Sequence, residues 1–338
     1  MKIYPLKFEP FLVEKVWGGR ALARLGKNLP AEESVRIGES WELADLPESA
    51  GGVSSIISNG PLRGKTLHGV IEQFGPRLLG RLQCYMDGCF PLLVKFIDAE
   101  SNLSIQVHPT HEYALHHPGV HAKSEAWYIL SAEPGAVIYK GLKREVSPEE
   151  FAESVRTGTI ADLLLALPAR PGECHFLPAG TCHALGAGVV VAEIQTPSDT
   201  TFRLHDWGRQ GRELHIEQAL ECVNLQPTDT RQQEKRSHIA GVFTTISRLI
   251  TADDFQIERI RMSEGYAQEI PYDQPAVWLV LEGGGRIELA DEQVSEVSFT
   301  VGDTLLIPAG MNDAKLALNA DTCWLEVQFP QTKMDLIA

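Results

Sequence analysis

Features that would point to a membrane or to nucleic acid are missing from this sequence. No apolar run approaches the roughly 18 residues of a transmembrane helix, and residues 1–7 lack the apolar segment of a secretory signal. Positive charge is in the minority, with 30 Lys and Arg against 45 Asp and Glu and a formal net charge of −15. Such a chain repels nucleic-acid phosphates and anionic lipid surfaces. We therefore expect a cytoplasmic protein without nucleic-acid or membrane partners.

Cysteine is also scarce. The 338 residues contain six cysteines at irregular spacing, which is too few for a disulfide scaffold. Cys84 and Cys89 lack the paired C-x-x-C spacing of a zinc knuckle. We expect reduced thiols, as in a cytosolic protein.

The chain is long enough for two domains, and its hydrophobic share of 43% suits a globular protein. Residues 1–60 have the short, glycine-broken apolar segments of strands and loops. The run Thr66–Phe74, closed by a glycine, predicts a helix. The apolar run Phe90–Ala99 predicts a buried strand. Beyond the best linker candidate, Thr228–Ser237, residues 242–326 have almost pure β patterning.

A helical insertion is predicted around residues 148–168. Ser147 is a suitable helix cap, a proline follows at the first helical position, and Glu150 lies three residues after the cap. The amphipathic stretch Phe151–Leu167 is broken at Gly158, which predicts two short helices.

An internal repeat indicates the domain organisation. Residues 172–183 and 302–313 both begin with glycine, have Pro-Ala-Gly after five more residues, and end with a polar side chain three residues later. Upstream, residues 125–130 match 276–281. We therefore predict a mainly β protein with helical insertions, built from two jelly-roll-like β-barrels in one chain. The predicted domains are residues 1–235, which include the helical insertion, and residues 236–338.

The two copies differ where chemistry would occur. The first copy has Glu125 and His183, whereas the second has Ala276 and Asp313 at the matching positions. Only the first copy can build a catalytic site with these residues, so the second barrel is predicted to be degenerate.

Candidate metal ligands lie on two predicted strands of the first copy. Gln106 and His108 are two residues apart, so their side chains share one face of a strand, where they could hold one metal ion. Glu125 lies on the next predicted strand, with Lys123 on the same face. The histidines between these strands are interpreted as parts of a solvated polar loop: His111, His116, His117 and His121.

His183 completes the candidate set. The pattern Gly-x5-Pro-x-Gly-x2-His over residues 172–183 is the second motif of the cupin family, in which this histidine is a metal ligand. Together, Gln106, His108, Glu125 and His183 supply two nitrogens and two oxygens, which suits one zinc ion with a position left for water or substrate. Manganese, iron or cobalt also fit this spacing. Either histidine alone would be interpreted as a satisfied core residue.

The first motif departs from the usual cupin pattern of His-x-His followed closely by glutamate. Its first position is Gln106, and sixteen residues separate His108 from Glu125. The arrangement resembles the type I mannose-6-phosphate isomerases (phosphomannose isomerases), which have a Gln-x-His-Pro strand, a Lys-x-Glu strand and a later histidine. The resemblance covers most of the chain, and the segments that support it are residues 16–19, 91–95, 104–109, 121–125, 193–195 and 198–203.

The resemblance implies a reaction. A metal-dependent aldose–ketose isomerase interconverts D-mannose 6-phosphate and D-fructose 6-phosphate through a cis-enediol, and a metal and a guanidinium stabilise charge on O1 and O2. Arg203 matches the family's catalytic arginine, Glu193 is the candidate general base, and Lys123 would reach the phosphate or assist ring opening. Ser104 and Trp17 are expected to line the pocket. The partner would be a phosphorylated hexose, and the chain a monomer or homodimer.

Structural roles are also open to these residues. Arg203 could form a surface ion pair with Asp199 or Asp206. Glu193 could be a structural carboxylate bonded to nearby backbone, and Lys123 could only balance the ligand carboxylate. A tryptophan such as Trp17 is more often a core residue than a pocket wall.

Two other classes of function share parts of this pattern. A cupin dioxygenase would use redox-active iron or copper, usually with three histidines and a glutamate, so Gln106 and the neighbouring Lys123 disfavour it. A non-catalytic sugar-phosphate-binding bicupin would bind without turnover. The intact ligand set in one copy disfavours that alternative.

Overall fold

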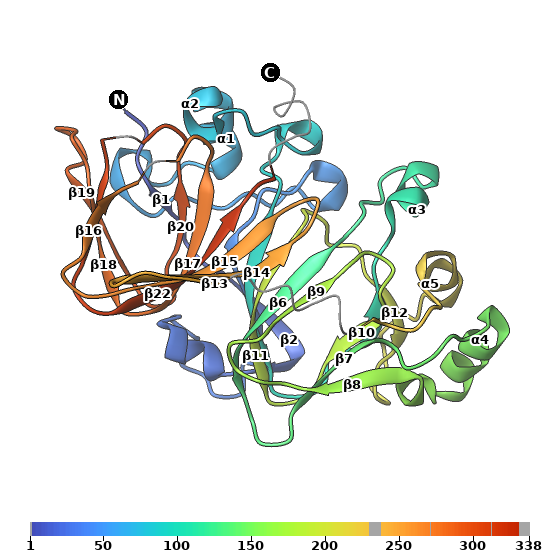
Figure 1. Cartoon of the computed structure of the whole chain (residues 1–338). Helices are drawn as coiled ribbons and strands as arrows, with labels where there is room; N and C mark the ends of the chain where they lie inside the picture. Colours follow the sequence, from blue (N-terminus) through green and yellow to red (C-terminus); the bar gives the residue numbers. More distant parts are fainter. Residues whose placement is uncertain (1, 230–237, 271, 312, 331–338) are drawn as a thin grey trace. The chain divides into compact units, whose positions relative to one another are not determined.

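The computed structural model describes residues 2–229, 238–270, 272–311 and 313–330. Its contacts divide the chain into two compact units. The inner unit consists of residues 11–53 and 92–233, and the terminal unit of residues 1–10, 54–91 and 234–338. Both are built mainly from antiparallel strands (Figure 1).

These units divide the chain differently from the predicted domains 1–235 and 236–338. Residues 1–10 and 54–91 group with the C-terminal part. One reason is that β1 (Leu6–Lys7) pairs with β20 (Thr304–Ile307). Local patterning carries no signal for a pairing between such distant segments. Residues 230–237 of the predicted linker lie outside the described residues.

One sheet of the inner unit has six strands, in the order β2-β3-β4-β11-β6-β9. The bounds are Phe11–Gly19 (β2), Ile37–Leu43 (β3), Leu93–Ala99 (β4), Val189–Gln195 (β11), Glu125–Ala132 (β6) and Cys174–Leu177 (β9). β11 is buried along its whole length because β4 and β6 flank it. The predicted strand at 90–99 corresponds to β4.

The other sheet of the inner unit has five strands, in the order β12-β5-β10-β7-β8. The bounds are Phe202–His205 (β12), Ile105–Val107 (β5), His183–Leu185 (β10), Val137–Leu142 (β7) and Leu164–Pro168 (β8). The core between the sheets draws on both, with Trp127 and Val191 from the six-stranded sheet and Ile138 and Leu185 from the five-stranded sheet. The two sheets therefore pack face to face, as in a sandwich.

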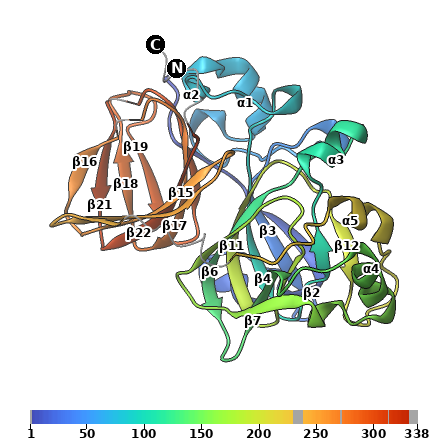
Figure 2. The same cartoon turned by 45° about the vertical axis from the view of Figure 1, so that its right-hand side comes forward.

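Helices cover the outer face of the five-stranded sheet (Figures 1 and 2). α4 (Pro148–Thr157) begins at Ser147, whose Oγ accepts the backbone N–H of Glu150, and ends at Gly158 with φ of 74°. This confirms the predicted cap and stop. α5 (Ile216–Cys222) packs beside α4 in the same core cluster.

The prediction of a second helix after Gly158 is wrong. After Gly158 the chain forms only a short 3-10 turn, η5 (Ile160–Asp162), and then the strand β8, which pairs with β7. Leu164 is buried, and residues 165 to 168 alternate between intermediate and exposed, as in a strand. In a short apolar run, the sequence pattern alone does not distinguish a strand from a helix.

The polar loop predicted between His108 and Glu125 contains a helix, α3 (His111–His116). The Thr110 side chain caps it by accepting the N–H of Tyr113. His111 and His116 are exposed as expected, but His121 is buried and its Nε2 lies 2.7 Å from Ser49 Oγ. The interpretation of a solvated loop therefore fails for His121.

The terminal unit contains a seven-stranded and a four-stranded sheet, in the orders β1-β20-β17-β22-β15-β14-β13 and β16-β21-β18-β19. Beyond β1 and β20, the bounds in the first sheet are Ala276–Glu282 (β17), Thr322–Gln328 (β22), Gln256–Met262 (β15), Thr244–Thr251 (β14) and His238–Ala240 (β13). Those in the second are Ala267–Glu269 (β16), Lys315–Leu318 (β21), Gly284–Glu288 (β18) and Glu296–Thr300 (β19). α1 (Leu67–Phe74), capped by Thr66, and α2 (Pro76–Leu79) complete the unit.

The internal repeat has the same strand register in both units. Glu125 of β6 lies opposite Leu177 of β9, and Ala276 of β17 lies opposite Ile307 of β20, as the sequence match requires. The neighbouring pairs also match, because Trp127 lies opposite Glu193 on β11 and Trp278 lies opposite Glu326 on β22.

The longest helix among the described residues, α4, has ten residues, and none has the length and hydrophobicity of a membrane span.

Candidate metal centre

Three predicted site residues form one row across the five-stranded sheet. Gln106 of β5 is the register partner of His183 on β10 and of Arg203 on β12. The residues that flank them along their strands belong to the core cluster under the helices: Ile105, Val107, Cys182, Ala184, Phe202 and Leu204. Because side chains alternate along a strand, Gln106, His183 and Arg203 share the opposite, inner face.

The six-stranded sheet supplies the carboxylate. Trp127 and Ile129 of β6 pack in the core between the sheets, so Glu125 at the start of the strand points inward as well. Its side chain is fully buried. His108 follows directly after β5 and is 2% exposed.

The ligand atoms of His108, Glu125 and His183 all lie within 4.8 Å of one another. His108 Nε2 is 3.2 Å from Glu125 Oε2, and His183 Nε2 is 3.2 Å from Glu125 Oε1. The fourth predicted ligand, Gln106, has its side-chain amide 3.4 Å from His183 Nε2. The structure therefore brings all four predicted ligands together.

The hydrogen bonds behind the imidazoles orient them for metal binding. His108 Nδ1 lies 3.0 Å from the carbonyl of Thr200, and His183 Nδ1 lies 2.7 Å from the carbonyl of Thr181. A carbonyl only accepts, so each Nδ1 carries the proton and each Nε2 presents a lone pair to the carboxylate. This arrangement is typical of metal-bound histidine.

Two acceptors at the centre lack a donor. Within the described residues, His108 Nε2 and Glu125 Oε1 are buried without a hydrogen bond. Burial lowers the pKa of His108 to about 3, the nearby Lys123 charge adds to this, and the Glu125 carboxylate opposes it, so the imidazole is neutral at pH 7. His108 Nε2 faces Glu125 Oε2 and His183 Nε2 faces Glu125 Oε1, each at 3.2 Å, and such facing acceptors are unfavourable without a cation between them. The donor set therefore fits a divalent metal such as zinc.

Ser104 positions the amide of Gln106. Its buried hydroxyl lies 3.2 Å from the Gln106 amide. The hydroxyl both donates and accepts, so the amide can turn its oxygen toward His183 and a shared cation without losing this bond. Ser104 is therefore placed to hold the Gln106 amide.

Lys123 contacts the ligand carboxylate directly, with Nζ 2.9 Å from Glu125 Oε2. Burial lowers the pKa of Lys123, but the carboxylates of Glu125 and Glu193 raise it further, so the amine stays charged. Burial likewise raises the pKa of Glu125, while the charge of Lys123 holds it well below its usual range. The pair is therefore ionised inside the unit.

Glu193 lies on β11 opposite Trp127, two residues before Gln195, which is opposite Glu125. Trp127 Nε1 donates to Glu193 Oε2 at 2.9 Å, and Lys95 Nζ lies 3.6 Å from Oε1. Burial and the charge of Glu125 raise the pKa of Glu193, against the opposing effects of Lys123 and Lys95. Its contacts are thus with side chains rather than with the backbone.

Arg203 is not held by the aspartates that the sequence suggested. Asp206 binds Arg209 Nη2 at 2.6 Å and Arg212 Nη1 at 3.0 Å. Arg203 Nη1 donates to the carbonyl of Glu213, and its buried Nε has no hydrogen bond within the described residues. Burial and the positive charge of Arg212 lower the pKa of Arg203.

Trp17 lies apart from these side chains. It is 4% exposed and packs in the core with Ile97, Leu103 and Trp127. Its surroundings are those of a core residue and give no support to the predicted role as a pocket wall.

Two buried residues near the centre were missed. Gln195, opposite Glu125 in register, donates to the carbonyls of Thr196 and Ser198, and its Oε1 has no donor within the described residues. Lys140 of β7 is the register partner of His183, is 2% exposed, and its Nζ also lacks a hydrogen bond there. The sequence signal for Lys140 was its position inside the apolar run Ala136–Leu142, where a lysine is unusual.

A mainly β fold that brings two histidines, a glutamate and a glutamine together defines a protein of the cupin class with a candidate metal centre. The family described as phosphomannose isomerase type I, catalytic domain, matches residues 6–138. Mannose-6-phosphate isomerase ManA of Bacillus subtilis is 33% identical over 323 residues, with 94% of this chain and 96% of that protein covered. Mannose-6-phosphate isomerase of Streptococcus mutans is 33% identical over 313 residues, covering 90% and 92%. The chain belongs to the mannose-6-phosphate isomerase family.

Solved structures show the same fold. The crystal structure of the mannose 6-phosphate isomerase from B. subtilis has a TM-score of 0.83 at 29% identity, with 96% of this chain and 99% of that chain covered. A structure of a mannose 6-phosphate isomerase bound with zinc and yttrium has a TM-score of 0.72 at 18% identity, covering 97% and 100%.

Proposed function

We propose that this protein interconverts D-mannose 6-phosphate and D-fructose 6-phosphate in a metal-dependent reaction through a cis-enediol. One observation carries this proposal: the buried cluster of His108, Glu125 and His183, with Gln106 beside it in the same row as Arg203. Relatives of about one-third identity over most of the chain are named mannose-6-phosphate isomerases, which supports the choice of substrate.

The proposed cofactor is one zinc ion held by Gln106, His108, Glu125 and His183. Two imidazole nitrogens, a carboxylate and an amide oxygen suit zinc, and other divalent metals also fit. A zinc-bound structure of the same fold supports the proposal. When bound, the metal would supply Lewis-acid stabilisation of charge that develops on the sugar oxygens O1 and O2.

Arg203 is proposed to stabilise the same charge from the neighbouring strand. A guanidinium keeps its proton at physiological pH, so it can hold an enediolate without a change of protonation. Its freedom from carboxylate partners in the described part of the chain supports this role, because a guanidinium already paired with a carboxylate attracts a second anion less.

Glu193 is proposed as the general base that moves a proton between C2 and C1. A pKa raised by burial favours such a role, because a base works best when its pKa is near the working pH. Lys123 is proposed to orient the Glu125 carboxylate and to reach the sugar phosphate or assist ring opening. Ser104 is proposed to line the pocket and to hold the Gln106 amide.

A dioxygenase is less well supported. The position that usually carries a third histidine is Gln106, and the relatives that match over most of the chain are named isomerases. A non-catalytic sugar-phosphate-binding bicupin is disfavoured by the intact ligand set in one copy of the repeat.

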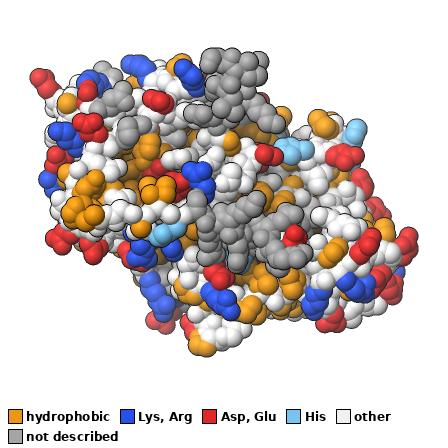
Figure 3. Space-filling view, in the orientation of Figure 1, with side chains coloured by type: hydrophobic (Ala, Val, Ile, Leu, Met, Phe, Trp, Pro, Cys, Tyr) orange, Lys and Arg blue, Asp and Glu red, His pale blue; other side chains and the backbone are white. Residues whose placement is uncertain are grey.

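We further infer that each pair of sheets is one jelly-roll barrel and that the second barrel is degenerate. The matching strand registers support this inference. The proposed partner is a phosphorylated hexose, the proposed state a monomer or homodimer, and the proposed location the cytoplasm. The proposal of no nucleic-acid partner rests on the net charge of −15. On the face that Figure 3 shows, acidic and basic side chains are interspersed.

A coupled assay tests the function. Fructose 6-phosphate formation from mannose 6-phosphate is measured with purified protein, with and without a chelator, and after addition of zinc. We expect activity that the chelator abolishes and zinc restores. Oxygen uptake with no ketose formation would favour the dioxygenase instead.

A further inference from the structure

The terminal unit contains a cavity of about 370 Å³ at the ends of β15, β17 and β22. This volume lies within the range of about 300–1,000 Å³ that is common for small-molecule sites. The side chains that give it its chemistry are Gln256, Tyr272, Asp273, Gln274, Gln328 and Phe329. We call it the repeat cavity.

Two residues of the repeat cavity are counterparts of residues near the candidate metal centre, whereas Asp313, the counterpart of His183, lines a larger cavity of the same unit. Ala276, which lines it, matches Glu125 in the repeat and in strand register. Gln328, at the end of β22, stands where Gln195 stands on β11. The second copy has therefore lost the metal ligands but has kept a hollow at the same end of the strands.

A buried carboxyl group holds part of the cavity lining in place. Glu326 is 2% exposed and is the counterpart of Glu193. It accepts hydrogen bonds from Tyr272 Oη, from Gln328 Nε2 at 2.5 Å and from Trp324 Nε1 at 3.3 Å. Tyr272 and Gln328 are therefore fixed before any ligand arrives, which lowers the entropic cost of binding.

Other polar groups of the lining have unused hydrogen-bonding capacity. Within the described residues, the amides of Gln256 and Gln274 and the carboxylate of Asp273 form no hydrogen bond or ion pair. Amides both donate and accept, and a carboxylate accepts. These are the groups that bind hydroxyls.

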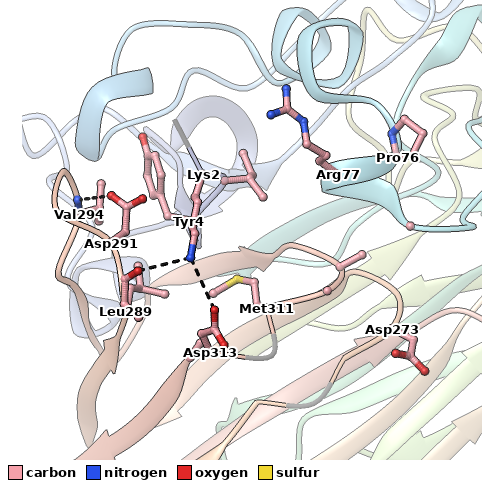
Figure 4. A pocket seen from close by; sticks show the side chains of 16 residues that line it. Lys2, Tyr4, Pro76, Arg77, Asp273, Leu289, Asp291, Val294, Met311 and Asp313 are labelled. Atoms are coloured by element: carbon pink, nitrogen blue, oxygen red, sulfur yellow. Dashed lines mark hydrogen bonds and ion pairs between the residues drawn. The ribbon is translucent and has the colours of Figure 1, made fainter.

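A larger cavity of about 490 Å³ in the same unit, shown in Figure 4, differs in this respect. Lys2 Nζ lies 3.5 Å from Asp313 and 3.4 Å from the carbonyl of Ala290. Asp291 accepts the backbone N–H groups of Gln293 and Val294. Several of its polar groups are thus already paired with one another, so this cavity carries no proposal.

The charge around the repeat cavity decides the class of ligand. Among the described residues, no Lys, Arg or His lines it. Where the inner unit has Lys95 opposite Glu193, the terminal unit has Glu258 opposite Glu326, with Arg248 balancing Glu258. A phosphate group would meet Asp273 without a cation to compensate.

We propose that the repeat cavity is a second ligand site, separate from the candidate metal centre, that binds an unphosphorylated sugar or polyol. Hydroxyl groups of such a ligand would bond to Gln256, Gln274 and Asp273. This inference does not depend on the isomerase activity.

Binding of D-mannose and D-mannitol to the full chain, followed by saturation-transfer NMR and calorimetry, tests the proposal. Gln256→Leu and Gln274→Leu should each weaken binding about three- to tenfold, since each removes a hydrogen-bonding group. Neither amide has a bond within the described residues, so both variants should fold normally. Gln268→Leu, an exposed amide on β16 outside the cavity, should bind like wild type.

Three results would overturn the proposal. They are no detectable binding of either probe, equal binding by wild type and both cavity variants, and displacement of D-mannitol by D-mannose 6-phosphate or by a diamine more readily than by D-mannose. The last result would show that the site selects charge rather than neutral hydroxyls.

Discussion

Gln106 and Arg203 are direct cross-strand partners on β5 and β12. The proposed metal ligand and the proposed electrostatic group thus share one face of one sheet. Each can nevertheless be removed separately, because Arg203 has no contact with the ligand cluster among its recorded hydrogen bonds, which go to Glu213 and His215. This separation permits a test that distinguishes metal binding from catalysis.

His183→Ala should lose both metal and activity. The variant removes one of two imidazoles and leaves Glu125 facing only His108 and Lys123. Metal analysis of the purified protein beside the coupled assay measures both effects. His111→Ala, an exposed histidine on α3, is the matched control and should keep both. A His183→Ala protein with full metal content would remove His183 from the ligand set.

Arg203→Ala should keep the metal and lower turnover by a factor of about 10² to 10⁴, because the guanidinium acts on charge that develops only during reaction. Kinetics and metal analysis on the same sample test this expectation. Arg170→Ala, whose side chain is 70% exposed, is the control and should be fully active. Full activity in a metal-free Arg203→Ala protein would end the assignment of catalytic roles to the metal and to Arg203.

Glu193→Gln should keep the metal and lose most of its turnover. The amide preserves size and can still accept from Trp127, but it cannot take up a proton. A loss of about 10² or more in kcat, with the acidic limb of the pH–rate profile removed, is the expected result. Unchanged kcat with lowered thermal stability would instead assign Glu193 the structural role.

Lys140→Met should stabilise the protein, and the gain should depend on pH. Burial lowers the pKa of Lys140 to about 7, against a weak opposing effect of Cys174. Between about pH 7 and 10 the unfolded chain therefore binds more protons at this site than the folded protein does, so wild-type stability rises with pH in this window. The stabilisation by methionine, on the order of several kcal/mol at pH 7, should accordingly shrink toward pH 10.

Denaturant unfolding at several pH values, at equal metal content, measures this effect. Lys143→Met is the control, because Lys143 follows directly after β7 and is exposed. A destabilised Lys140→Met protein at pH 7 would show that the amine has a partner that outweighs its desolvation.

Local signals in the sequence predicted the elements that depend on local chemistry. The Ser147 cap and the Gly158 stop fix α4, and the alternation around Gln106 and His108 places the ligands on one face. The ligand set could be predicted from the sequence because the second copy of the repeat lacks Glu125 and His183 at the matching positions. These features need no knowledge of distant partners.

The remaining features depend on long-range pairing. β8 is a strand because β7 offers it an edge, although Leu164–Pro168 alone also suits a helix. Lys140 lies beside His183 only because β7 pairs with β10, which no spacing along the chain reveals. Residues 1–10 and 54–91 group with the C-terminal part of the chain for the same reason, since their packing depends on long-range pairing.

The pairing of β1 with β20 has a consequence for synthesis. Leu6 is synthesised 300 residues before its strand partner, Leu306. Until Leu306 is made, the edge of β1 that pairs with β20 is unpaired, and Leu6, which is fully buried in the finished protein, lacks that neighbour. The β1 strand therefore cannot complete its pairing until β20 has been synthesised. A fragment cut after residue 235 would retain β1 without its strand partner.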